Sequence, residues 1–249
     1  MSTWHYGLVA RWWAEFNRGG PEVEYFRPFV ASGQPALDAG CGTGRLLLPW
    51  LRDGLDVDGC DVSADMLAEC RRLAAVDGLE PALSAQALHE LDLPRRYGAI
   101  VCCGTFGLGS TRAEDAEALR RLHDHLEPDG VLALDVERPG PFPDVSPTSA
   151  GPPPAERRPG SDGCEYALRG HVVAVDPAQR RVTRAIHAWQ WRDGELAAEE
   201  EHLLTESLYE SDELVALLRG AGFADVEVRE GASAWGNDML VFVARRPVV

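Results

Sequence analysis

The chain has 249 residues, of which 45% are hydrophobic and 26% charged, which is enough for one full α/β core and a smaller elaboration. The formal net charge is −16 and no run of Lys and Arg stands out, so nucleic acid is disfavoured as the main partner, because binding it requires cations that neutralise phosphates. We find neither a basic segment followed by an apolar run nor the ~20 apolar residues of a membrane helix, and we expect a cytoplasmic protein without a membrane partner.

Cysteine and histidine spacing gives no sign of a metal site. No two cysteines form a C-x-x-C pair and no two histidines form an H-x-x-x-H pair, the spacings typical of zinc sites. We expect reduced thiols, no disulfide and no bound metal. The six cysteines are Cys41, Cys60, Cys70, Cys102, Cys103 and Cys164.

The first 30 residues are rich in aromatic side chains and predict a helical cap. Residues 4–30 have a helical pattern that breaks at Gly19-Gly20-Pro21. Two interpretations of Trp12, Trp13 and their aromatic neighbours stay open: an amphipathic cap packed on the core, and a lid over a ligand.

From residue 36 onward, short apolar segments alternate with helical patterns. Ser63 is a good N-cap for the second of three helices. This alternation predicts a parallel sheet with helices on both faces, that is, a doubly wound α/β fold. We expect strands at 36–38, 57–61, 82–86, 99–103 and 131–136, and helices at 46–51, 63–76 and 113–126.

The pattern changes after residue 138. A loop rich in Pro, Gly and Ser covers 138–162, and three segments of strand-like alternation follow, separated by turns at Asp176-Pro177 and Asp193-Gly194. We therefore expect a small antiparallel sheet, within an insertion at 138–206 that covers the substrate pocket. A helix at 211–220 and strands at 226–229 and 239–244, the last one antiparallel, complete a single Rossmann-like domain over residues 1–249.

A glycine-rich turn joins the first strand to the first helix. It reads Asp38-Ala-Gly40-Cys-Gly42-Thr-Gly44, and glycines there let the chain turn tightly and let a ligand approach the backbone. Asp61 ends the next strand, where a carboxylate can accept both hydrogen bonds of a ribose diol. The spacing G-x-G-x-G differs from the G-x-G-x-x-G of dinucleotide sites. S-adenosylmethionine instead carries a sulfonium and an ammonium, which favour a nearby carboxylate such as Asp38.

These residues resemble the signature motifs of the class I S-adenosylmethionine-dependent methyltransferases. The resemblance runs from about residue 30 to the end of the chain, except for 138–205. Even this insertion resembles those of small-molecule N- and O-methyltransferases, including enzymes acting on amino sugars and glycine-like amines. The matching segments are 38–44 (first motif), 60–63 with Met66-Leu67 (second motif), 125–134 (the turn before strand five and the strand itself), 221–223 and 241–244 (the close).

The resemblance implies S-adenosylmethionine as the cofactor, bound by segments that follow the first four strands and by aromatic residues of the cap. Many members place an acid after strand three to accept from the adenine amino group. Here Gln86 or a backbone carbonyl would take that part. The implied cofactor-binding residues are Tyr6, Trp12, Asp38, Gly40, Cys41, Gly42, Gly44, Asp61, Val62, Met66, Gln86, Ala87, Leu88, Cys103 and Gly104.

Methyl transfer from a sulfonium is an in-line displacement, so alignment of acceptor and methyl supplies much of the rate. A base is needed only if the acceptor arrives protonated. Glu137, just past strand five, and His89, after strand three, are the catalytic candidates, and Thr105, Phe106 and Glu137 are the substrate candidates. We expect a metal-independent transfer to an N or O atom of a small organic molecule.

Three other functions were weighed. The glycine spacing argues against an NAD-dependent oxidoreductase on the same fold class. Two further functions remain alternatives: binding of S-adenosylmethionine without catalysis, and use of the sulfonium for non-methylating chemistry.

The edge strands of the insertion could also pair two chains into a homodimer.

Overall fold

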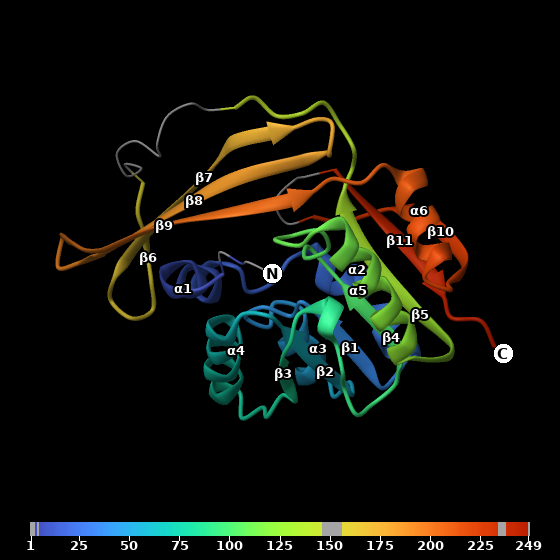
Figure 1. Cartoon of the computed structure of the whole chain (residues 1–249). Coiled ribbons are helices and arrows are strands. Elements are labelled where there is room, and N and C mark those ends of the chain that lie inside the picture. Colours follow the sequence, from blue (N-terminus) through green and yellow to red (C-terminus); the bar gives the residue numbers. More distant parts are fainter. Residues whose placement is uncertain (1–2, 4, 146–155, 234–237, 249) are drawn as a thin grey trace.

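The computed structural model describes residues 3, 5–145, 156–233 and 238–248 of the chain. It contains a seven-stranded sheet and a four-stranded sheet, with helices around the first (Figure 1). Part of the expected loop at 138–162, and residue 4 of the expected cap, lie outside the described residues. In the described part of the chain, no helix is long and apolar enough to cross a membrane.

The larger sheet has the strand order β10-β11-β5-β4-β1-β2-β3. Only β11 runs antiparallel, to both β5 and β10, so the expected mostly parallel sheet with an antiparallel last strand is confirmed. The element at β5 begins five residues earlier than predicted and takes in the expected turn at 128–130. The strands are β1 (Ala36–Ala39), β2 (Val57–Asp61), β3 (Leu83–Ala85), β4 (Tyr97–Cys102), β5 (Leu126–Glu137), β10 (Ala224–Glu230) and β11 (Met239–Arg245).

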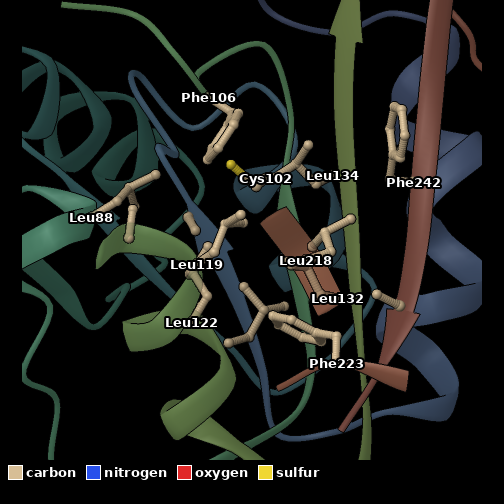
Figure 2. Close-up of a cluster of buried hydrophobic side chains, with 14 of the residues drawn as sticks. Leu88, Cys102, Phe106, Leu119, Leu122, Leu132, Leu134, Leu218, Phe223 and Phe242 are labelled. Atoms are coloured by element: carbon tan, nitrogen blue, oxygen red, sulfur yellow. The ribbon is translucent and has the colours of Figure 1, made fainter. Parts of the chain in front are cut away.

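Two apolar clusters cover the two faces of this sheet. One joins α5 and α6 to the sheet, and Figure 2 shows Leu119 and Leu122 of α5 pointing toward Leu132 of β5. The other joins α2, α3 and α4 to the opposite face, with Phe26 of α2 fully buried. The helices are α1 (Gly7–Phe16), α2 (Pro21–Ser32), α3 (Leu47–Arg52), α4 (Ala64–Val76), the 3₁₀ turn η1 (Leu88–Glu90), α5 (Arg112–His125) and α6 (Ser211–Gly220).

Local signals fix where two of these helices begin. The Ser63 hydroxyl accepts from the backbone N–H of Met66, as its N-cap position predicts. Thr111 and Glu114 form a reciprocal capping box at the start of α5, which satisfies two backbone donors at once. These caps set the direction of the chain after β2 and after the loop that follows β4.

The smaller sheet is antiparallel, in the order β6-β7-β8-β9, and lies across one end of the larger sheet (Figure 1). Leu8, Val9 and Trp12 of α1 pack against it in a cluster with Tyr166 and Ile186. The three long strands match the prediction, whereas the two-residue β6 carried no pattern. The strands are β6 (Arg158–Pro159), β7 (Glu165–Asp176), β8 (Arg181–Arg192) and β9 (Glu195–Ser207).

The end of β9 is joined to the loop after β4 by backbone hydrogen bonds. Gly109 N–H donates to the Thr205 carbonyl at 2.8 Å, and Ser207 N–H donates to the Gly107 carbonyl at 2.9 Å. Leu108 and Glu206 form an antiparallel bridge between them. We call residues 107–109 and 205–207 the seam, because they attach the smaller sheet to the larger one.

The first residues of α1 and those just before it are hydrogen-bonded to two different parts of the molecule. Gly7 N–H donates to Asp65 of α4 and Leu8 N–H donates to Glu200 of β9, each at 2.8 Å. The Ser63 hydroxyl also donates to the His5 carbonyl. Residues 5–8, which we call the N-terminal clasp, therefore bridge α4 and β9.

Candidate active site

A cavity of about 500 Å³ opens between the carboxyl ends of the parallel strands and the smaller sheet. Its walls come from the loops after β1, β2, β3, β4 and β9, from the end of β5, from α5, β8 and β9, and from residues around the N-terminal clasp. Ligands bind at this end of open α/β sheets, and the volume is typical of small-molecule sites.

The glycine loop adopts a backbone conformation that only glycine takes without strain. Gly40 and Gly42 have φ values of +85° and +54°, and a Cβ on Gly40 would lie 2.5 Å from the side chain of Thr105. Gly44 also has a positive φ, but a Cβ there would meet Leu48 and Cys70. Gly40 and Gly42 therefore keep the cavity floor open, whereas Gly44 allows the following helix to pack.

Asp61 holds the glycine loop in place. Its Oδ2 accepts from the backbone N–H of Gly42 at 2.9 Å, and its Oδ1 accepts from that of Ser63 at 2.8 Å. Burial raises the pKa of this carboxyl, while the backbone donors oppose the rise. Each oxygen keeps a second lone pair for a ligand hydroxyl.

Asp38 fits a positively charged ligand. The residue is 2% exposed, and its Oδ2 has no hydrogen-bond partner in the described part of the chain. Burial raises its pKa to about 7, although Arg45 acts in the opposite direction. A buried oxygen without a donor is costly, and a cationic group beside it removes that cost. The residues present therefore fit the sulfonium and ammonium of S-adenosylmethionine.

A buried polar network lies beside this position, and the sequence analysis missed most of it. Asp135 of β5 accepts from the backbone N–H of Gly104 at 2.5 Å and from the Cys103 thiol at 3.1 Å. Arg45 donates to Cys103 and forms an ion pair with Glu22 of α2 at 2.9 Å. Burial raises the pKa of Asp135 to about 6. The sequence feature that could have indicated this network is Asp135, an acidic residue within the otherwise apolar strand at 131–136.

Most of the expected site residues meet at the cavity. Gln86 lines it, but its side-chain amide is engaged by the backbone N–H and carbonyl of Asp92, so it is not aimed at a ligand. The other expected residues on the cavity wall are Asp38, Gly40, Cys41, Gly42, Asp61, Val62, Met66, Ala87, Leu88, Cys103, Gly104, Thr105, Phe106 and Glu137.

Four expected residues do not line the cavity. Tyr6 is 44% exposed and its ring lies 4.2 Å from that of His202, whereas Trp12 packs against the smaller sheet. His89 lies 3.6 Å from Glu114, and Gly44 is a packing position. Residues next to three of them line the cavity instead: His5 beside Tyr6, Trp13 beside Trp12, and Glu114 beside His89.

The sequence did not predict which residues of β8, β9 and the loop after β9 line the cavity. Arg184 pairs with Glu206 at 2.8 Å, and Tyr209 packs against Phe106 with ring centroids 5.4 Å apart. The Ser207 hydroxyl is buried without a partner. Alternation along a strand gives two candidate faces, and only the packed structure shows which one meets the cavity. No cluster of metal ligands occurs among the described residues.

Comparison with known proteins agrees with this geometry. A family model described as a methyltransferase domain matches residues 36–130. The dTDP-3-amino-3,6-dideoxy-alpha-D-glucopyranose N,N-dimethyltransferase of Streptomyces fradiae is 34% identical over 100 residues, which are 40% of this chain and 38% of that protein. The chain thus matches well under half the length of this curated relative.

Solved structures extend the likeness to nearly the whole fold. The sugar N-methyltransferase KedS8 from Streptoalloteichus has a TM-score of 0.73 at 22% identity, covering 99% of this chain and 98% of that one. CalS10, an amino pentose methyltransferase from Micromonospora echinaspora solved with its S-adenosylmethionine bound, has a TM-score of 0.61 at 22% identity, covering 90% and 88%.

The glycine loop held by Asp61, the open cavity above it and these matches are those of a methyltransferase fold. Residues 36–130 match the methyltransferase family model, and the fold of nearly the whole chain is that of S-adenosylmethionine-dependent methyltransferases. S-adenosylmethionine is accordingly the cofactor that we expect this cavity to bind.

Proposed function

We propose that this protein transfers a methyl group from S-adenosylmethionine to an amine nitrogen of a small organic molecule. The charge of the cavity carries the proposal. Both of its guanidinium groups, on Arg45 and Arg184, are paired with glutamates, whereas carboxylates predominate on the wall. The carboxylates belong to Glu22, Asp38, Asp61, Glu114, Asp115, Asp135, Glu137 and Glu206.

This charge favours a cationic acceptor over an anionic one. Glu137 and Glu206 lie on the walls contributed by β5 and β9, where a protonated amine would gain from their charge. The two Arg184 nitrogens both reach Glu206 Oε1, so its Oε2 receives no hydrogen bond from the described residues. The relative from Streptomyces fradiae, named for dimethylation of an amino sugar, supports the same acceptor chemistry.

The protein contributes alignment and desolvation to this reaction. The cofactor supplies a methyl group that is already activated by its sulfonium. Phe106 and Leu204 present apolar surface to the acceptor, and Glu137 attracts its charged end. Holding the nitrogen in line with the methyl group converts a two-body reaction into an effectively unimolecular one.

Two measurements test the proposal in order. Calorimetric titration with S-adenosylmethionine, its demethylated product and NADH should show binding of the first two alone. Transfer of a labelled methyl group to 3-amino-3,6-dideoxy-D-glucose and to 6-deoxy-D-glucose, which carries a hydroxyl in place of the amine, should show turnover of the amine only. Cofactor binding with equal or greater turnover of the hydroxyl sugar would refute amine specificity.

A further inference from the structure

A hydrogen-bonded chain of three polar side chains lies on one wall of the cavity. Tyr209, between β9 and α6, donates from its hydroxyl to Asp115 Oδ2 at 2.6 Å, and Ser110 donates to Asp115 Oδ1. All three side chains line the cavity and are buried. Because the Tyr209 hydroxyl donates its hydrogen bond to Asp115, the lone pairs of its oxygen remain free to accept a hydrogen bond from a molecule in the cavity.

The Tyr209 ring is fixed from two sides. Phe106 packs against it, and the Arg112 guanidinium lies 4.6 Å from the ring centre on one face. Arg112 is itself held, since it donates to the Leu208 carbonyl at 2.9 Å and pairs with Glu213 of α6. The hydroxyl therefore occupies a defined position beside the seam, on the wall that faces the acceptor.

We propose that Tyr209 accepts a proton from the acceptor amine while Asp115, acting as a positioning residue, takes the proton that Tyr209 carries. The proposal rests on the proposed function above. An ammonium N–H bond breaks and its proton joins the Tyr209 oxygen, as the Tyr209 O–H bond breaks and its proton joins Asp115 Oδ2. The amine lone pair then bonds to the methyl carbon, and the carbon–sulfur bond breaks with both electrons left on sulfur. Asp115 returns the proton through Tyr209 to solvent when the products leave.

The surroundings favour this direction of proton movement. Burial raises the pKa of Asp115 above its ordinary value, Glu114 adds to the rise, and Arg112 together with the two hydroxyl donors opposes it. Glu213 of α6 is the other charged group acting on Tyr209. A cationic sulfonium next to the ammonium lowers the pKa of the ammonium, because like charges disfavour each other. The proton therefore leaves the amine before the methyl group moves.

Tyr209→Phe and Asp115→Asn test the relay, with Tyr97→Phe as the matched control. Tyr97 is also buried and donates to an aspartate, Asp58, at 2.9 Å, but neither residue lines the cavity. Turnover of 3-amino-3,6-dideoxy-D-glucose is measured from neutral pH to a pH above the pKa of the free amine. Both relay variants should lose about 100-fold in kcat at neutral pH, with an unchanged KM for S-adenosylmethionine. The loss should shrink at high pH, where the amine arrives already neutral.

A second readout does not depend on turnover. In protein with ¹³C-labelled aspartate carboxyls, Tyr209→Phe should shift the titration of Asp115, and Tyr97→Phe should leave it unchanged. A loss in kcat that is equal at every pH, or no loss, would overturn the relay while leaving the amine proposal intact. A wild-type chain that binds the cofactor but never methylates the amine would refute the proposed function, and the relay would fall with it.

Discussion

Asp38 and Asp61 stand at the ends of neighbouring strands, yet their surroundings prepare them differently. Asp61 is satisfied by two backbone donors, whereas Asp38 keeps one oxygen without a donor in a buried position. Burial raises the pKa of both carboxyls, and that of Asp38 reaches about 7. Asp61 therefore supports the loop without a ligand, whereas Asp38 becomes favourable only when a cation faces it.

The raised pKa of Asp38 predicts a pH dependence of stability in the protein without cofactor. The folded state retains a proton that the unfolded state loses near pH 4, so the stability contributed by Asp38 falls as pH rises from about 4 to about 7. Asp38→Asn removes this loss. Chemical unfolding at pH 5 and pH 8 should show the variant gaining stability relative to wild type at the higher pH, by on the order of 2 kcal/mol. Exposed Asp92→Asn is the control, and a gain that is equal at both pH values would contradict the assignment.

Asp61→Ala should weaken cofactor binding without unfolding the protein. The change removes two charge-assisted hydrogen bonds to a ribose diol, which are worth about 2–4 kcal/mol in binding. Calorimetry with the demethylated cofactor measures the loss. Asp58→Ala, on the same strand but bound to Arg95 and Tyr97 outside the cavity, should lower stability and leave cofactor affinity unchanged. Wild-type affinity in Asp61→Ala would remove this residue from the site.

At the scale of elements, the seam decides how the smaller sheet meets the cavity. It places Glu206 and Ser207 of β9 directly beside the loop that carries Thr105 and Phe106. Cavity-lining residues from two segments about 100 residues apart, which we propose to contact the acceptor, are thereby held in one register. Loss of the seam should affect acceptor binding more than cofactor binding.

Gly107→Ala tests the seam, with Gly194→Ala as its control. Both glycines have a φ of +81°, but a Cβ on Gly107 would lie 2.8 Å from the Ser207 carbonyl oxygen, whereas nothing lies within 4 Å of one on Gly194. The control should cost about 1–2 kcal/mol of left-handed strain alone. Gly107→Ala should lower Tm further and raise the acceptor KM. Equal Tm values in the two variants would show that the seam tolerates displacement.

Helices and strands with a strong local sequence signal were predictable, but which face of each element points to the cavity was not. The strand at 57–61 and the Ser63 cap agree with the structure, because strand pattern and capping act within a few residues. The helical pattern near the N-terminus gave a helix but not its orientation. Packing of α1 on β7 and β8 turns Trp12 away from the cavity and Trp13 toward it.

At the scale of the whole molecule, the site combines segments that no local pattern links. The cavity floor was predictable because the glycine loop and Asp61 follow consecutive strands of a recurring fold. Glu22 of α2 meets Arg45 only because α2 and α3, which Arg45 precedes, pack on one face of the sheet. Arg184 comes from the insertion at 138–206 and Tyr209 follows it directly, so the placement of both depends on the seam.

The arrangement of potential metal ligands around the whole cavity predicts a reaction that needs no metal. The carboxylates that line it are spread over separate elements, and no group of metal ligands gathers among the described residues. We expect turnover to be unchanged by dialysis against a chelator and unaffected by added magnesium. Activity that is lost on chelation and restored by a divalent cation would contradict this expectation.

The N-terminal clasp has a kinetic consequence. Residues 5–8 are hydrogen-bonded to α4, to its N-cap Ser63 and to β9, and His5 among them forms part of the cavity wall. We expect a molecule as large as the cofactor to pass this wall only when those hydrogen bonds open, and an acceptor bound above it to block that passage. Substrates should then add in a fixed sequence, cofactor first, and its demethylated form should depart last. Product inhibition by that form would be competitive against S-adenosylmethionine and not against the acceptor.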